Sequence, residues 1–449
     1  MSLVKALLMI VCVAQGAPAK ESSASVFDSY LTPYVQTNNF SGSVLIEENG
    51  KVLFQKAYGF ADREKKVSNR ATTRFHIASV SMQFTATAIL RLVDQGAITL
   101  NTHVSEVIPG FAGGEKVSIR DLLMERSGLP DINDLPEYAQ ILQSHQTPAS
   151  LVERVSGKPL LFEPGTKFLH EEHSAYNLLA LIIEKKTGMP FARAMEKLVF
   201  KPARLSNSSV DDDGPIPDSA KGYQPRGTEE LEPATEIHWS AKSGNGSVVT
   251  TVGNEVRFVH VLFEKDLLKP GSQEAILDTS ERVGYGWFRS MNRRFHETAY
   301  SMNGRAPGFA SFVLYLPKEK LTVVAFSNIY SSATTTIGND LAAIALGLPY
   351  EGFHPAEKAL SAEQIRVSTG EFQFGEDFYQ KNAKLVLQAE DSELSLRWPS
   401  GDISPLISVG ADSFIDRAYW EEVRIERGPD GLPKALVYDR FRGNSVPRK

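Results

Sequence analysis

The chain is almost free of cysteine, because Cys12 is the only one among its 449 residues. One thiol forms no intrachain disulfide and supplies too few ligands for a thiolate zinc site. Cys12 lies in an N-terminal segment with the features of an export signal, so the mature chain is expected to contain no thiol and no cysteine nucleophile. The stability of the mature protein must therefore come from packing.

The N-terminal segment also lacks the length needed to span a bilayer. Nine apolar residues, 6–14, follow Lys5 and precede small residues at 17–19, whereas a transmembrane helix needs about 20. This pattern is typical of a cleaved signal peptide over residues 1–19 and predicts a secreted or periplasmic protein with no integral membrane segment after processing. An uncleaved interfacial anchor is the alternative. Lipid attachment at Cys12 is not favoured, because Val11 stands where a small residue is needed.

No charge of one sign dominates the sequence, which has 48 basic and 54 acidic residues and a net charge of −6. The charges are well mixed, so no basic face is expected and nucleic acid is not a predicted partner. The length favours two domains over one core. We expect a main domain over residues 25–350 and a C-terminal β-rich module over 360–449.

Hydrophobic patterns predict both helices and strands. An alternating pattern around Asn49-Gly50 predicts a hairpin over 41–60. Apolar residues at helical spacing predict three helices, over 79–96, 176–186 and 334–346. Further strands are predicted over 283–289, 309–317 and 321–328, and the polar stretch 200–244 is interpreted as long loops that edge a cleft. The short strands after residue 360 predict a small β-barrel or sandwich.

Ser79 opens the first of these helices, in the segment 75–86. This segment resembles the Ser-x-x-Lys region of the serine β-lactamase-related and penicillin-binding-protein-like family, in its class C β-lactamase, D,D-peptidase and esterase group. Further segments resemble the same group in the same order, and together they cover about residues 30 to 345: 119–123, 127–131, 162–168 and 307–311. The resemblance implies an α/β (α+β) fold with an antiparallel sheet flanked by helices and a helical lobe.

The sequence departs from that family where the family carries its cations. The lysine one helical turn after the serine is Met82, and the Lys or His of the Lys/His-Thr-Gly strand is Met302. A thioether cannot accept the proton of a serine hydroxyl, so activation of the family type is absent. The family's oxyanion hole uses backbone N–H groups, here those of Ser79 and of Arg305, and Asn303 and Gly304 are expected beside them in the cleft.

The family's Tyr-x-Asn element is also replaced, by the string His170-Glu171-Glu172-His173. One hypothesis is that His170 or His173, oriented by Glu171 or Glu172, acts as a base toward Ser79. A solvated loop before a helix is the simpler interpretation. A zinc site bound by the two histidines is the third interpretation. The sequence does not identify another ligand for it, so no metal site is predicted.

The leading interpretation is an exported, catalytically degenerate member of the family, a pseudoenzyme that binds a peptide, cell-wall fragment or small acyl ligand in the old cleft. The alternative is an active esterase or peptidase that uses Ser79 with His170 or His173 as the base. Neither interpretation requires a cofactor, and the partner expected in both is a small molecule or a peptide. The sequence predicts no oligomeric state.

Overall fold

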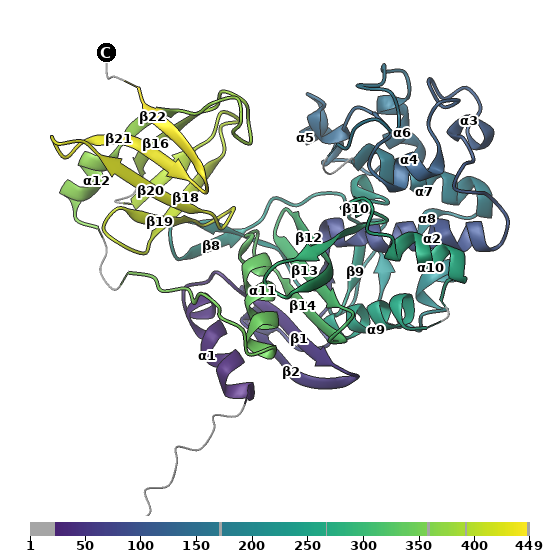
Figure 1. The fold of residues 1–449 in the computed structure, drawn as a ribbon, viewed down its shortest axis with the longest axis horizontal. Coiled ribbons are helices and arrows are strands. Elements are labelled where there is room, and N and C mark those ends of the chain that lie inside the picture. The colour runs from purple at the N-terminus through teal and green to yellow at the C-terminus, as the bar shows by residue number, and fades with distance from the viewer. Residues whose placement is uncertain (1–22, 170–172, 266, 357–359, 391–392, 447–449) are drawn as a thin grey trace, which may run out of the picture.

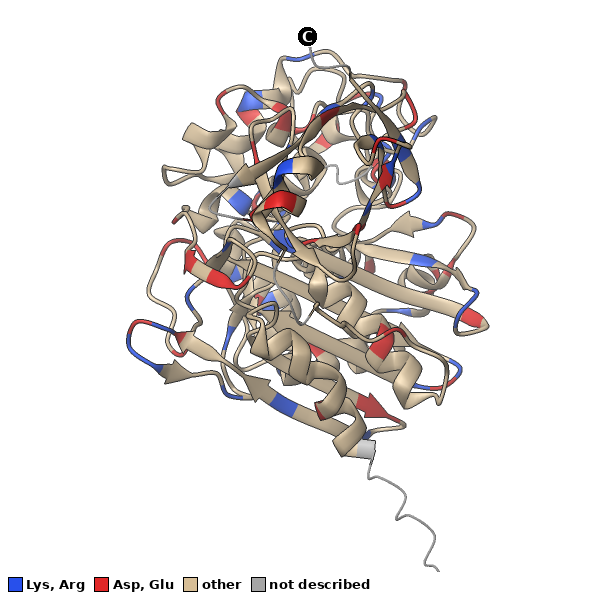
Figure 2. Cartoon of the chain, turned by 90° about the vertical axis from the view of Figure 1, so that its left-hand side faces the viewer, with Lys and Arg blue, Asp and Glu red and all other residues tan. Residues whose placement is uncertain are grey.

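The computed structural model describes residues 23–169, 173–265, 267–356, 360–390 and 393–446. Figure 1 shows three parts: a central sheet with helices on its faces, a helical lobe, and a separate barrel on the other side of the sheet. Basic and acidic residues are interspersed over the elements in view in Figure 2, in keeping with the small net charge. The predicted signal peptide and the string His170-Glu171-Glu172 lie outside the described residues.

The central sheet has seven antiparallel strands. In spatial order they are β10 (Val283–Gly284), β11 (Trp287–Asn292), β12 (Glu297–Ala306), β13 (Phe309–Leu316), β14 (Leu321–Ser327), β1 (Gly42–Glu48) and β2 (Lys51–Tyr58). The predicted hairpin is formed by β1 and β2. The predicted strand at 283–289 is instead interrupted, because Tyr285 and Gly286 adopt positive φ angles and turn the chain between β10 and β11.

Both faces of the sheet are covered, which explains why every residue of β13 and β14 is buried. One face packs against α1 (Ser23–Gln36) and α11 (Ala333–Ala345), and Phe312 and Leu314 point to it. Val313 and Tyr315 alternate to the other face, which shares its core with α9 (Val252–Phe263). This period of two is the pattern expected of a strand buried on both sides.

The helical lobe is built around two buried helices, α2 (Ser81–Asp94) and α7 (His173–Thr187), which contact each other. Gly96 ends the first with φ of 74°, as its sequence position predicts for a C-cap glycine. The other helical segments of this part are α3 (Val104–Val107), α4 (Ile119–Leu123), η2 (Ile132–Asp134), α5 (Tyr138–Ile141), α6 (Pro148–Ser156), α8 (Phe191–Met195), η3 (Glu196–Phe200) and α10 (Pro270–Leu277).

Short strands and turns connect the sheet to the lobe. They are β3 (Phe60–Asp62), β4 (Val67–Ser68), β5 (Phe75–His76), η1 (Ala78–Val80), β6 (Ser209–Val210), β7 (Tyr223–Arg226), β8 (Glu230–Pro233), η4 (Trp239–Lys242) and β9 (Val248–Thr250). The stretch 200–244 therefore contains ordered elements in addition to loops. Trp239 and Ala241 are buried, which ties its C-terminal end to the core.

The C-terminal part is a closed barrel of eight antiparallel strands, preceded by α12 (Ala362–Ser368). Its strands are β15 (Gly370–Gln373), β16 (Lys384–Glu390), β17 (Glu393–Arg397), β18 (Ile403–Ser408), β19 (Ser413–Asp416), β20 (Glu422–Arg427), β21 (Pro433–Tyr438) and β22 (Phe441–Ser445). Closure between β15 and β22 leaves no free sheet edge. The predicted fold class is confirmed, and of the two predicted forms of the C-terminal module the barrel is the one observed.

Candidate active site

Ser79 lies in the 3-10 turn η1, between the short strand β5 and helix α2. The preceding residue, Ala78, has φ of 45°, in the left-handed region that residues with a Cβ atom rarely adopt. Such local strain is maintained only where the surroundings impose it, and it is common next to functional groups. The Ser79 side chain is fixed at a defined point between sheet and lobe and is only 7% exposed.

Strand β12 runs directly beside this turn. A Cβ atom added to Gly304 would lie 2.5 Å from the carbonyl oxygen of Ile77 and 2.7 Å from the backbone nitrogen of Ser79. Only glycine permits this approach. Ser311, on the neighbouring strand β13, donates a hydrogen bond of 2.6 Å to the same Ile77 carbonyl. The strand that carries Asn303, Gly304 and Arg305 is therefore held against the backbone of Ser79.

A cavity of about 450 Å³ opens above Ser79. It is lined by residues from the sheet, the lobe and the loop 242–246: Ala78, Ser79, Asn133, Tyr138, Leu142, His173, Lys242, Asn245, Gly246, Asn303, Arg305, Ala306, Pro307, Tyr330 and Ser332. Four residues singled out from the sequence, Ser79, His173, Asn303 and Arg305, thus share one cavity. Its size lies within the range of small-molecule sites, about 300–1,000 Å³.

His173 begins α7 and is held by Asp131. Its Nδ1 lies 3.1 Å from Asp131 Oδ2, and its backbone N–H donates to the same oxygen at 2.7 Å. Burial raises the pKa of the Asp131 carboxyl, but the hydrogen bond and charge of His173 outweigh it and hold that pKa below its ordinary value. The carboxylate that contacts His173 among the described residues is Asp131, a partner that the sequence did not suggest. His170 and Glu172 lie outside the described residues.

Met82 and Met302 are both buried in the hydrophobic core, at 0% and 4% exposure. Neither belongs to the lining of the Ser79 cavity. Methionine fills irregular gaps in apolar surroundings, and here it does so at two positions where the family resemblance expects a cation.

A lysine and a tyrosine that sequence reasoning missed also line the cavity. Lys242 Nζ donates a hydrogen bond to the hydroxyl of Tyr138 and lies 5.1 Å from the centre of the tyrosine ring. The two residues are 104 positions apart, so no local sequence signal links them. Lys242 brings a positive charge into a cleft whose family-type cations are absent.

The backbone and the side chain of Arg305 have different roles. The backbone of Arg305 lies in β12 beside the Ser79 turn, as expected. Its guanidinium points toward the barrel, where Nη1 donates to the carbonyl of Ala418 at 2.7 Å. The guanidinium lies 4.6 Å from the ring centre of Tyr330 and 4.2 Å from that of Tyr419. One residue thus borders the cleft and anchors the barrel.

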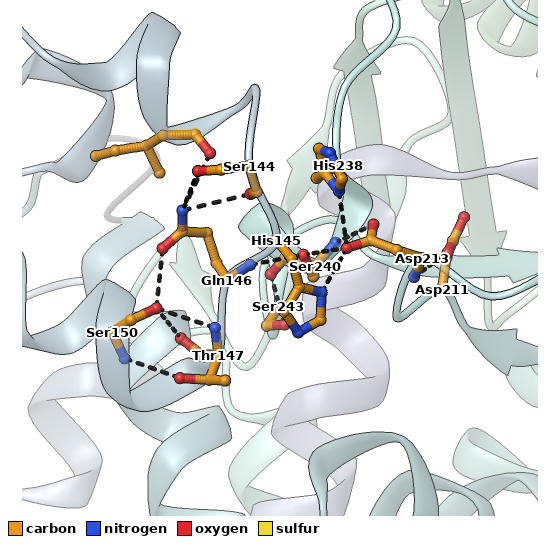
Figure 3. Close-up of polar contacts among 11 residues, drawn as sticks. Ser144, His145, Gln146, Thr147, Ser150, Asp211, Asp213, His238, Ser240 and Ser243 are labelled. Atoms are coloured by element: carbon orange, nitrogen blue, oxygen red, sulfur yellow. Dashed lines mark hydrogen bonds and ion pairs between the residues drawn. The ribbon is translucent and has the colours of Figure 1, made fainter.

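The turn η4, which ends at Lys242, is held in place by Asp213 (Figure 3). Asp213 accepts hydrogen bonds from the Ser240 hydroxyl at 2.6 Å and from its backbone N–H at 3.2 Å. His145 and His238 place Nδ1 atoms 2.7 Å and 3.1 Å from the same carboxylate. This arrangement, here called the Asp213 clasp, joins three segments of the chain, at residues 145, 213 and 238–240.

Replacing Asp213 with asparagine is expected to lower the free energy of unfolding by about 1 kcal/mol at pH 7. The effect is small because solvent weakens the hydrogen bonds and ion pairs of a partly exposed carboxylate. Burial raises the pKa of Asp213, but hydrogen bonds from Ser240 and His145 outweigh it and hold the pKa at about 2. The stabilisation is therefore present above the ordinary value of 3.8 and is lost as the pH falls toward 2. Urea denaturation at pH 7 and pH 3 measures this. The exposed neighbour Asp212→Asn is the control and should change neither value.

Within the residues that the structure describes, no three histidine, cysteine, aspartate or glutamate side chains are grouped so that they would hold a metal ion. In that same part of the chain, no helix has the length and apolar character needed to cross a membrane.

The antiparallel sheet, the helical lobe and a serine at the start of the helix between them define a protein of the penicillin-binding-protein-like class. The chain belongs to the beta-lactamase family, whose model matches residues 27–347. The resemblance inferred from the sequence is confirmed by this match.

Two curated relatives and one solved structure illustrate the relationship. Protein flp of Staphylococcus aureus (strain MRSA252) is 27% identical over 327 residues, which cover 69% of this chain and 64% of flp. The putative penicillin-binding protein PbpX of Bacillus subtilis (strain 168) is 27% identical over 306 residues, or 68% of this chain and 74% of PbpX. The octameric penicillin-binding protein homologue from Pyrococcus abyssi has a TM-score of 0.64 at 20% identity and covers 93% of this chain and 99% of its own. The chain therefore spans less than two thirds of flp, and the structural likeness shows the fold alone.

Proposed function

We propose that the Ser79 cleft binds the carbonyl or carboxylate group of a peptide, cell-wall fragment or small acyl ligand, and that it has lost catalysis of the family type. The observation that carries this proposal is the burial of Met82 and Met302 outside the cavity lining. Without a base next to it, a serine hydroxyl remains neutral and is a poor nucleophile. The N-terminal apolar segment supports export, so the ligand would be met outside the cytoplasm.

The remaining groups of the cavity suit an oxygen-bearing ligand. Backbone N–H groups at Ser79 and Arg305 do not depend on side-chain identity, so an oxyanion hole of the family type survives the substitutions. Lys242 adds a positive charge, and Asn133, Asn245 and Asn303 add amide donors. A carbonyl or carboxylate placed above Ser79 therefore meets donors from three sides of the cavity.

A second candidate function is that of an active serine hydrolase, and the observation in its favour is the contact between His173 and Asp131 in the wall of the same cavity. In this mechanism His173 accepts the proton of Ser79 as the oxygen attacks the substrate carbonyl, and then gives it to the leaving group. Asp131 orients the imidazole and stabilises its positive charge. Water then hydrolyses the acyl-serine, with His173 again as the base.

One set of measurements separates the two functions. For the binding function, we expect p-nitrophenyl acetate hydrolysis by the wild type to equal that of Ser79→Ala, and a fluorophosphonate probe to leave Ser79 unlabelled. N-acetylated dipeptides should bind, with affinity about tenfold weaker in Lys242→Met, because a charge-assisted contact to the carboxylate is lost. Lys51→Met, on the distant hairpin, is the control and should bind as the wild type does.

The opposite pattern would establish the hydrolase. Labelling of Ser79, together with turnover that disappears in both Ser79→Ala and His173→Gln, would refute the binding-only proposal. Turnover that survives in His173→Gln but not in Ser79→Ala would instead direct attention to Lys242 or His170 as the base.

A further inference from the structure

A second cavity, of about 510 Å³, lies between the β-lactamase-like part and the barrel. Its wall on the sheet side is polar and includes Asn303, Ser332 and Thr336. The barrel contributes five aromatic side chains and the carboxyl group of Glu421. We call this space the barrel-side cavity. Asn303 and Ser332 line both this cavity and the Ser79 cavity, so the two are adjacent.

The aromatic rings of the barrel-side cavity meet at steep angles. The rings of Trp398 and Tyr438 are 5.4 Å apart between centres and inclined by 86°. Those of Trp398 and Tyr419 are 5.1 Å apart and inclined by 56°. Rings inclined in this way pack edge to face on one another, so this wall of the cavity is rigid and is not one flat stacking surface.

Polar contacts hold these rings in place before any ligand arrives. Tyr438 donates a hydrogen bond of 3.0 Å to the buried carboxyl of Asp416, and Tyr379 donates one of 2.8 Å to Asp439. Tyr419 is covered on the sheet side by the guanidinium of Arg305. Since little side-chain freedom is left to lose, a ligand would bind to a preorganised wall.

Glu421 is the one carboxyl group among the described residues that line this cavity. Among the described residues, its carboxyl group has neither a hydrogen bond nor an ion pair, although the side chain is half-buried. Burial, with the nearby charges of Asp439 and Asp416, raises the pKa of Glu421 to about 7, and Arg440 opposes this. The Glu421 carboxyl group is therefore near two acidic residues and one arginine, and it forms no ion pair with any of the described residues.

We propose that the barrel-side cavity is a subsite for an organic ammonium group, which docks against the partly exposed Tyr419 and Trp420 rings, beside the buried rings of Trp398 and Tyr438, with the Glu421 carboxylate as its counter-ion. A cation gains from the negative faces of the rings and from the ion pair, and both gains are larger in a partly desolvated cavity. An anionic ligand would be repelled by the same carboxylate. Taken together with the proposed function of the Ser79 cleft, this subsite favours ligands that carry an amine at one end and a carbonyl group at the other.

Choline and its neutral isostere 3,3-dimethylbutan-1-ol test this subsite, because the two differ in charge and hardly in shape. We expect choline to bind and to change the fluorescence of Trp398 and Trp420, two of the four tryptophans of the chain. The isostere should bind at least tenfold more weakly. Choline affinity should rise between pH 6 and pH 8, as the Glu421 carboxylate forms. Isothermal titration of the full chain measures both ligands.

Glu421→Gln should weaken choline binding about tenfold and remove its pH dependence. Glu422→Gln is the matched control, because Glu422 is the next residue in sequence and its side chain is 61% exposed. Tyr379→Leu, at an exposed ring, offers a second variant that leaves the barrel core intact. Choline binding that is absent in the wild type, or equal to that of the isostere, or unchanged in Glu421→Gln, would overturn the proposal. None of these outcomes depends on dipeptide binding at Lys242, so the two proposals fail separately.

Discussion

Replacing Glu255 with glutamine is expected to raise the free energy of unfolding by about 3 to 5 kcal/mol at pH 8.5. Glu255 lies in the first turn of α9 with no exposed surface, and within the described part of the chain its two carboxyl oxygens have no hydrogen-bond partner. Burial raises its pKa from 4.5 to about 8. Glutamine keeps the shape of the side chain and stays neutral at every pH, so the cost of a buried charge is removed.

The sign of the pH dependence follows from the raised pKa. Below about pH 4.5 the carboxyl group is protonated in both the folded and the unfolded chain, and wild type and variant should be similarly stable. As the pH rises toward 8, the unfolded chain ionises first, and the wild type should lose stability relative to Glu255→Gln. Guanidinium denaturation at pH 5 and pH 8.5 measures the difference. Glu274→Gln, at an exposed position of α10, should show no such trend. A difference that does not grow with pH would contradict the buried-charge explanation.

The second large effect is expected at Arg417, which follows β19 and is fully buried. Its guanidinium donates to Asn39 Oδ1 at 2.9 Å, to the Asn38 carbonyl at 3.1 Å and to the Glu230 carbonyl at 2.8 Å. These acceptors all belong to the β-lactamase-like part of the chain. Arg417→Met removes all of these donors and leaves the buried Asn39 side chain without its partner, which is expected to cost about 3 to 5 kcal/mol.

Thermal unfolding and limited proteolysis of the full chain measure this loss. We expect the barrel of Arg417→Met to be cleaved from the rest at temperatures where the wild type resists protease. Arg424→Met changes an arginine of the same barrel whose side chain is 55% exposed, and it should behave as the wild type. An Arg417→Met variant as stable as this control would show that the contacts of Arg417 do not hold the barrel in place.

Much of the fold could be predicted because its main elements carry strong local patterns. The hairpin of β1 and β2 is visible at Asn49-Gly50, and the end of α2 is visible at Gly96. The helix predicted at 176–186 begins three residues earlier, at His173, because Asp131 accepts a hydrogen bond from its first N–H. Asp131 lies 42 positions away in sequence, so local pattern does not reveal it.

The candidate site was predictable only where it follows the family motifs. Ser79, Asn303 and Arg305 could be located because the motif order places them. Lys242 could not, because it lies in a polar stretch whose composition indicates loops, and its role in the cavity depends on Tyr138 and on the Asp213 clasp. The barrel-side cavity could not be predicted either, because its lining comes from two parts of the chain that are far apart in sequence.

The double contact of Arg305 sets a limit on how this chain can be shortened. A fragment that stops before the barrel would leave the guanidinium without the Ala418 carbonyl and the Tyr419 ring. It would also uncover Tyr34 and Phe353, whose rings pack against Trp420 in the intact chain. The bared aromatic surface favours aggregation. The cleft and the barrel therefore form one structural unit. A shorter chain limited to the family match, residues 27–347, would not keep the cleft as it is in the whole protein.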